Sequence, residues 1–140
     1  MKKLGILAVA FLFLSLTSSA QEETGNTITV IVENVLSDGG TILAGLHTED
    51  TFMKNGGIAN ASSPAKAGEV VLTFENVQPG TYAIMVMHDA NDNMRMDMEV
   101  NGMPKESYGM SGNAMTMGPP TFADAKFELT DEDQEFRIRF

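Results

Sequence analysis

Apolar and polar residues alternate with a period of two along most of the chain from residue 27 onward. In the segment 27–33, Ile28, Val30 and Val32 fall on one face. Alternation of this kind predicts a β-strand with one face in a core. The pattern returns in five later segments, whose apolar positions are Ile42, Ala44 and Leu46; Val70, Leu72 and Phe74; Tyr82, Ile84 and Val86; Phe127 and Leu129; and Phe136, Ile138 and Phe140. The chain is therefore predicted to be all-β.

Turn-forming residues separate the predicted strands. Residues 37–40 read Ser-Asp-Gly-Gly, and residues 78–81 read Gln-Pro-Gly-Thr, which suits a type II turn. Residues 48–68 form a longer polar connection, in which a short helix is expected near 50–54. Roughly six to seven short antiparallel strands with this spacing predict a sandwich of two sheets.

The first twenty residues resemble a secretory signal peptide. Lys2 and Lys3 precede an uncharged apolar run at 4–16, and small residues follow at 18–20. The run is shorter than the roughly 20 residues that a membrane-spanning helix needs, which disfavours the alternative of a retained anchor. We therefore predict a cleaved signal at 1–20, a single mature domain at 21–140, no membrane span after cleavage, and a periplasmic or secreted location.

Charge and cysteine content narrow the classes of partner. The chain has 9 Lys and Arg against 19 Asp and Glu, a net charge of −10, and it has no Cys. Loss of Lys2 and Lys3 with the signal would make the mature charge still more negative. An acidic surface repels nucleic acid and anionic membranes and attracts cations. The partner is unknown at this point, and another envelope protein or a glycan is compatible with this surface.

Residues 89–121 interrupt the alternation. Unstructured connections longer than about 12–15 residues are uncommon in compact domains and are often functional. The segment contains seven Met residues and does not have the composition of a disordered linker. We predict that it forms a structured cap over the sandwich.

The start of this segment has the spacing of a calcium-binding loop. Oxygen-bearing side chains occupy positions 1, 3, 5 and 9, and a backbone carbonyl would contribute at position 7. The predicted ligands are Asp89, Asn91, Asn93 and Asp97 through their side chains and Arg95 through its carbonyl. Positions 6 and 12, which are Gly and Glu in an EF-hand, hold Met94 and Val100. The alternative is a polar turn at a strand end, where Asp and Asn are common.

Methionines give a second metal hypothesis. Nine Met residues fall between residues 85 and 117, and thioethers favour Cu(I). The candidate soft-metal ligands are Met94, Met96, Met98 and His88. The competing interpretation is that Met fills irregular gaps in a core. His88 is in phase with the core-facing residues of 82–86, so it is also expected to close the edge of the core or to orient the loop by hydrogen bonding.

Catalytic motifs are not found in the sequence. There is no Cys nucleophile, the serines lack nucleophile-elbow spacing, and no Gly-rich phosphate loop occurs. Two histidines are too few for a three-His zinc site. We therefore predict a protein without enzymatic activity. A third hypothesis is an adhesion or carbohydrate-binding module with Tyr82, Tyr108, Phe52 or Phe122 as platforms, against which the absence of Trp counts.

Four motifs together resemble the DUF2141 family of exported bacterial proteins. They are Phe-Glu-Asn-Val-Gln-Pro-Gly-Thr-Tyr-Ala at 74–83, His-Asp-Ala-Asn-Asp-Asn at 88–93, Tyr-Gly-Met-Ser at 108–111 and Met-Gly-Pro-Pro-Thr-Phe-Ala-Asp-Ala at 117–125. The resemblance implies an exported sandwich of the immunoglobulin-like or prealbumin-like kind, without a known activity. Members often read Asp-x-Asn-x-Asn-Gly-x-x-Asp in the loop. Here Met94 stands at the Gly position, and Met110 stands where an aromatic residue is more usual.

Overall fold

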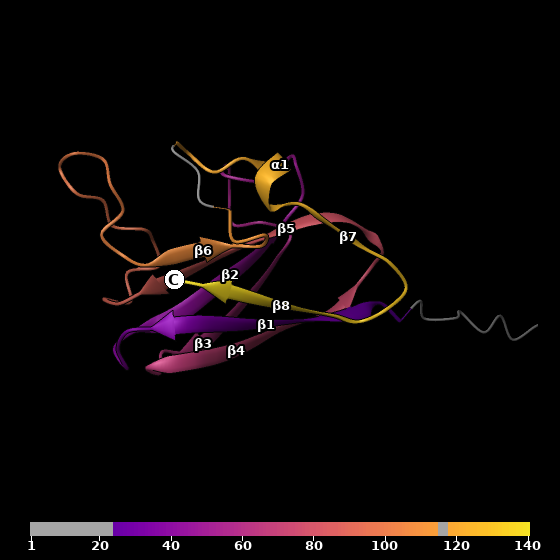
Figure 1. Cartoon of the computed structure of the whole chain (residues 1–140), viewed down its shortest axis with the longest axis horizontal. Coiled ribbons are helices and arrows are strands. Elements are labelled where there is room, and N and C mark those ends of the chain that lie inside the picture. Colours follow the sequence, from indigo (N-terminus) through magenta and orange to yellow (C-terminus); the bar gives the residue numbers. More distant parts are fainter. Residues whose placement is uncertain (1–23, 115–117) are drawn as a thin grey trace, which may run out of the picture.

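Two β-sheets face each other in the computed structural model of the protein, which describes residues 24–114 and 118–140 (Figure 1). One sheet has the strand order β4-β1-β8, and the other has the order β3-β2-β5-β6, with β7 also pairing with β5. The elements are β1 (Asn26–Val35), β2 (Thr41–His47), β3 (Ala59–Pro64), β4 (Gly68–Val77), β5 (Gly80–Asp89), β6 (Tyr108–Met110), α1 (Phe122–Ala125), β7 (Phe127–Leu129) and β8 (Gln134–Arg139). The predicted sandwich of two sheets is confirmed.

The core lies between the sheets and consists of the residues that the alternation marks as apolar. Ile28 and Val30 of β1, Ile42 of β2, Ile84 of β5 and Ile138 of β8 have no exposed surface. Their neighbours in sequence point outward, because successive side chains of a strand leave opposite faces of the sheet. Burial of each large aliphatic side chain contributes about 1.5–3 kcal/mol, so this layer is the main source of stability.

The structure contains two strands that the alternation does not predict. β3 lies within the connection 48–68 and pairs with β2, and the three-residue β6 pairs with β5. No helix forms at 50–54, where consecutive turns occur instead, whereas the short helix α1 was not predicted. One pairing also differs from the expected antiparallel arrangement, because β1 and β8 run parallel.

The segment 89–121 forms a cap only in its second half. The first half projects beyond the ends of the strands as the loop drawn in orange between β5 and β6 (Figure 1). Residues 108–114 and α1 pack on the outer face of β5, where Ala83, Met110 and Ala125 are buried together. The predicted cap is therefore confirmed for the described residues after β6 and wrong for the projecting part. Met115 and Met117 lie outside the described residues.

Ser111 fastens the second half of the segment to β5. Its backbone N–H donates to the carbonyl of Ile84, and its hydroxyl accepts from the N–H of Ile84, both at 2.9 Å. The same hydroxyl donates to the carbonyl of Ala125, which precedes β7. Because Ser111 is buried, these bonds fix the position of α1 against the sheet.

The predicted signal peptide, residues 1–20, lies outside the described residues. Within 24–114 and 118–140, no helix is both long and apolar enough to cross a membrane.

Candidate functional site

Asp89 ends β5 and anchors the loop that follows it. Its side chain has no exposed surface. One carboxyl oxygen accepts from the N–H of Asn93 at 3.1 Å, and the other accepts from the N–H of Met94 at 2.8 Å. The loop therefore turns around the Asp89 carboxyl group, in the way that Asp residues commonly fold the backbone that follows them.

The side chains of Asn91, Asn93 and Asp97 meet on the other side of this turn. The amide nitrogen of Asn91 donates to Oδ2 of Asp97 at 2.6 Å, and that of Asn93 donates to both carboxylate oxygens at 2.9 and 3.0 Å. The backbone N–H of Asn93 lies 3.3 Å from Oδ1 of Asn91 and 3.1 Å from Oδ1 of Asp89. The structure thus gathers the four predicted side-chain ligands around Asn93.

Arg95 belongs to the same turn. Its backbone N–H donates to Oδ1 of Asn93 at 3.1 Å, and its side chain is exposed. Among the described residues, no group of three His, Cys, Asp or Glu side chains is placed to hold a metal ion. The predicted ligand set contains only two such side chains, Asp89 and Asp97, because the other two are amides.

Glu106 is a member of the site that the sequence did not indicate. Its Oε1 accepts from the N–H of Ala90 and its Oε2 accepts from the N–H of Asp97, each at 3.1 Å. It returns to the loop because residues 97–105 form a hairpin, in which Met98 pairs with Pro104. Glu106 therefore bridges the two ends of the predicted calcium loop.

The turn between β1 and β2 and the first residue of β2 contact the end of β5 and the loop that follows it. The Thr41 hydroxyl donates to Asp92 at 2.6 Å, and Nε2 of His88 lies 2.6 Å from the carbonyl oxygen of Gly39. The His88 ring also stacks on Phe140 with 6.5 Å between ring centroids. His88 is buried, which confirms the expectation that it closes the edge of the core.

The candidate soft-metal ligands are distributed differently from the oxygen ligands. Met94 and Met98 are 74% and 52% exposed, whereas Met96 is half-buried. His88 directs Nε2 at a backbone carbonyl rather than at these thioethers. Met94, Met98 and Met103 do not fill a core, so the interpretation of Met as packing residue does not hold for these three.

Comparison with known proteins identifies the family. A family model described as an uncharacterized protein conserved in bacteria, DUF2141, matches residues 30–137, which is most of the chain. The chain belongs to the DUF2141 family. No curated protein and no solved structure matches it. The resemblance seen in the four sequence motifs is therefore confirmed, and the DUF2141 match spans the whole candidate site.

Met94, which stands at the Gly position of the resembling loop motif, has the left-handed backbone conformation that favours Gly. Its φ is 63°, in the left-handed region that side chains with a Cβ adopt at a cost of about 1–2 kcal/mol. Two N–H groups bonded to the Asp89 carboxyl, those of Asn93 and Met94, hold it there. The tight turn is therefore present in this DUF2141 protein despite the missing Gly.

We predict that Met94→Gly stabilises the protein by about 0.5–1 kcal/mol, because relief of the left-handed strain exceeds the entropy that Gly loses on folding. Little packing is lost, since Met94 is 74% exposed. Urea unfolding measures the change. Met103→Gly is the matched control: Met103 is 62% exposed and has no positive φ, so its replacement should lower stability. Equal effects of the two substitutions would show that strain at Met94 is negligible.

The Asp97 carboxylate is electrostatically favoured in the folded protein. Hydrogen bonds from Asn93 and then Asn91 lower its pKa below the usual value of 3.8, against a smaller opposing effect of burial. The positive charges of Arg95 and Lys105 act in the same direction. Asp97 is therefore ionised at neutral pH and presents a full negative charge within the loop.

This lowered pKa predicts an acid-dependent contribution to stability. A depressed folded-state pKa stabilises the protein above the unfolded-state value near 3.8, and this stabilisation is lost as the pH falls through the folded-state value. The difference in Tm between wild type and Asp97→Asn should therefore shrink when the pH is lowered from about 6 to about 2.5. Glu99→Gln is the control, since Glu99 makes no side-chain hydrogen bond to the described residues. A pH-independent difference would contradict this assignment.

Proposed function

We propose that this DUF2141 protein is a non-enzymatic exported β-sandwich domain with a binding role in the cell envelope or outside the cell, whose loop 89–97 holds Ca²⁺ as a structural ion. One observation carries the calcium proposal. The side chains of Asp89 and Asn91 accept from the backbone N–H of Asn93, and Asp97 accepts from the side-chain amide of Asn93. Four oxygen-bearing side chains are thereby held in a turn of nine residues.

The chemistry of these groups suits a hard cation. Ca²⁺ takes six to eight oxygen ligands at about 2.3–2.6 Å and accepts irregular geometry. A rotation of about 180° around χ2 exchanges the nitrogen and oxygen of an Asn side chain. Such rotations would turn the oxygens of Asn91 and Asn93 toward Asp97, where the amide nitrogens now donate. The Arg95 carbonyl, Glu106 and water supply the remaining ligands in this proposal.

The negative charge of Asp97 is a further argument for a bound cation in this proposal. Asp97 accepts hydrogen bonds from two amide side chains and forms no salt bridge with the described residues. An ion would replace these neutral donors by a divalent charge, which is a stronger partner for a carboxylate. Export would expose the site to extracellular calcium, for which Kd values of about 10⁻⁴–10⁻³ M are sufficient.

Thermal unfolding with Ca²⁺ and with EDTA tests the proposal. For Kd between about 10⁻⁴ and 10⁻³ M, about 10 mM Ca²⁺ should raise the Tm by roughly 5–10 °C. Asp97→Asn should lose most of this rise, and Asp131→Asn should keep it. Asp131→Asn removes the same charge as Asp97→Asn. Asp131 lies in an exposed turn, and its side chain makes no hydrogen bond to the described residues. A Tm that Ca²⁺ does not change, or that Mg²⁺ raises equally, would exclude a specific calcium site.

A second candidate function is Cu(I) binding by thioethers. The observation that favours it is the exposure of Met94, Met98 and Met103, which lie close together in sequence on one projecting loop. Anaerobic titration of Cu(I) against a chelator of known affinity separates the two candidates. A sub-micromolar site that Met94→Leu and Met98→Leu weaken together would support copper. Binding of Cu(I) no tighter than to a Met-free variant of the loop would exclude it.

A further inference from the structure

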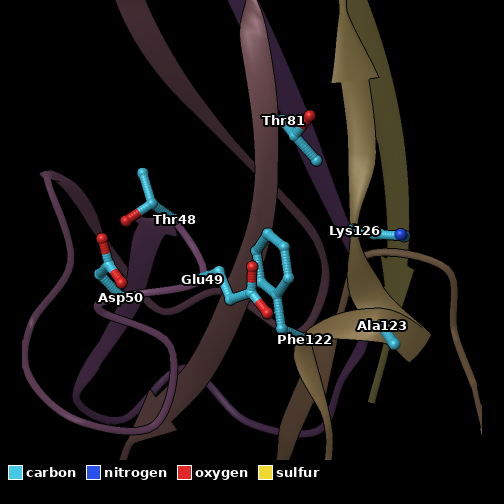
Figure 2. Close-up of a pocket in the computed structure, with 7 residues that line it drawn as sticks. All are labelled: Thr48, Glu49, Asp50, Thr81, Phe122, Ala123 and Lys126. Carbon is cyan, nitrogen blue, oxygen red and sulfur yellow. The ribbon is translucent and has the colours of Figure 1, made fainter.

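A second feature of the molecule lies away from the calcium loop, on the outer face of β5. There an open hollow of about 420 Å³ is bordered by the turn after β2, the start of β5 and helix α1. Figure 2 shows the Phe122 ring between the turn with Thr48 and Asp50 on one side and Lys126 on the other. Three segments that are distant in sequence therefore form this hollow.

Phe122 is a fixed aromatic surface in the hollow. It is half-buried and packs edge-to-face on Phe52, with 5.8 Å between the ring centroids. Phe52 is buried and packs in turn edge-to-face against His47 at 5.9 Å. This row of three rings holds Phe122 in place, so a ligand would not have to order it.

The rim of the hollow carries polar groups that the protein itself does not use. Among the described residues, the side chains of Glu49, Asp50 and Lys126 make no hydrogen bond or ion pair. Thr81 contributes a hydroxyl, which reaches Glu128 only at 3.5 Å. The rim thus offers acceptors, a donor and a hydroxyl, all of which remain available to a ligand.

This combination restricts the class of ligand. The two carboxylates disfavour an anion, and Lys126 disfavours a simple amine. A sugar ring has an apolar C–H face for an aromatic ring and hydroxyls that both donate and accept. The volume is in the range of about 300–1,000 Å³ that is usual for small-ligand pockets. A neutral saccharide therefore matches both the aromatic surface and the mixed rim.

The four aromatic residues that the sequence suggested as sugar-binding platforms differ in exposure and position in the structure. Tyr82 and Phe52 are buried in the two cores and are excluded from contact with a ligand. Tyr108 is 43% exposed but does not border the hollow. Phe122 is half-buried and borders the hollow together with the polar groups of its rim.

We propose that the hollow beside α1 is a binding site for a neutral saccharide, with Phe122 as the platform and with Glu49, Asp50 and Lys126 as hydrogen-bonding groups. The site is independent of the calcium proposal, because it uses none of the residues of the loop 89–97. Its open shape and the few groups involved predict weak binding, with a Kd on the order of 1 mM for a single sugar ring.

Saturation-transfer difference NMR on the full mature domain tests this proposal. The probes are N-acetylglucosamine, glucose and cellobiose at about 5 mM, with choline and acetate as charged comparisons. We expect transfer to the ring protons of at least one neutral sugar. Phe122→Leu should weaken binding about three- to tenfold. Tyr108→Leu, which removes an aromatic ring outside the hollow, should leave it unchanged.

A second variant distinguishes loss of the binding site from loss of the folded structure. Glu49→Gln combined with Asp50→Asn changes only exposed side chains without partners among the described residues, and it should alter the affinity at unchanged Tm. No transfer to any neutral sugar with folded protein would overturn the proposal. So would binding of choline alone, or sugar binding that both the Phe122 and the carboxylate variants leave intact.

Discussion

Replacement of Asp89 by Ala should lower the free energy of unfolding by about 3 kcal/mol. The substitution leaves the N–H groups of Asn93 and Met94 without their acceptor, and hydrogen bonds to an acidic side chain are worth about 1.5–3 kcal/mol each. The full sum is not reached, because water can reach part of the altered loop. Asp89 has no exposed surface, so the substitution also opens the edge of the core.

Urea unfolding of a small series measures this effect. Asp89→Asn retains one acceptor oxygen and should lose roughly half as much stability as Asp89→Ala. Asp131→Asn, at an exposed turn, should change stability by less than about 0.5 kcal/mol. If Asp89→Ala and Asp131→Asn had the same effect, the Asp89 carboxyl group could not be what folds the loop.

Gly40→Ala should destabilise the protein by about 3 kcal/mol. Gly40 has a φ of 78°, and a Cβ at this position would overlap the carbonyl oxygen of Asp89 and lie 2.7 Å from the Cα of Ala90. The left-handed conformation costs Ala about 1–2 kcal/mol, and the forced displacement of packed backbone costs about 1–3 kcal/mol more. The turn and the loop are in contact here, so Ala at position 40 would also displace the start of the candidate site.

Two other glycines separate these contributions. Gly68 has a φ of 103° and open space around it, so Gly68→Ala measures the backbone strain alone. Gly39 has no positive φ, and its nearest neighbour is the Ser37 hydroxyl at 4.0 Å, so Gly39→Ala should be nearly neutral. We expect the loss of stability to rise from Gly39 to Gly68 to Gly40. A Gly40→Ala variant no less stable than Gly68→Ala would contradict the close approach to Asp89.

The strands that could be predicted from the sequence are those with large apolar residues on one face. Ile28, Ile84 and Ile138 are buried as their period of two requires. β3 could not be found in this way, because its six residues read Ala-Asn-Ala-Ser-Ser-Pro and only its small Ala and Ser side chains are partly buried. The parallel pairing of β1 with β8 could not be predicted from the alternation either, because alternation does not indicate the direction of the neighbouring strand.

Only those residues of the candidate site that lie close together in sequence could be predicted. Asp89, Asn91, Asn93 and Asp97 lie within nine residues, so one turn of the backbone is enough to bring them together. Glu106 reaches the site through the hairpin 97–105, and Thr41 reaches it through the pairing of β2 with β5. Neither contact has a signal in the linear sequence, because each depends on where a distant segment folds back.

The most direct measurement of the calcium proposal is a crystal structure of the mature domain grown with about 10 mM Ca²⁺, with anomalous differences recorded. The proposal predicts an anomalous peak in the loop 89–97, with side-chain oxygens of Asp89, Asn91, Asn93 and Asp97 at about 2.3–2.6 Å. It also predicts that the amide groups of both asparagines are reversed relative to the hydrogen bonds they now make to Asp97. An ordered loop without a peak, in which both amide nitrogens still donate to Asp97, would contradict it.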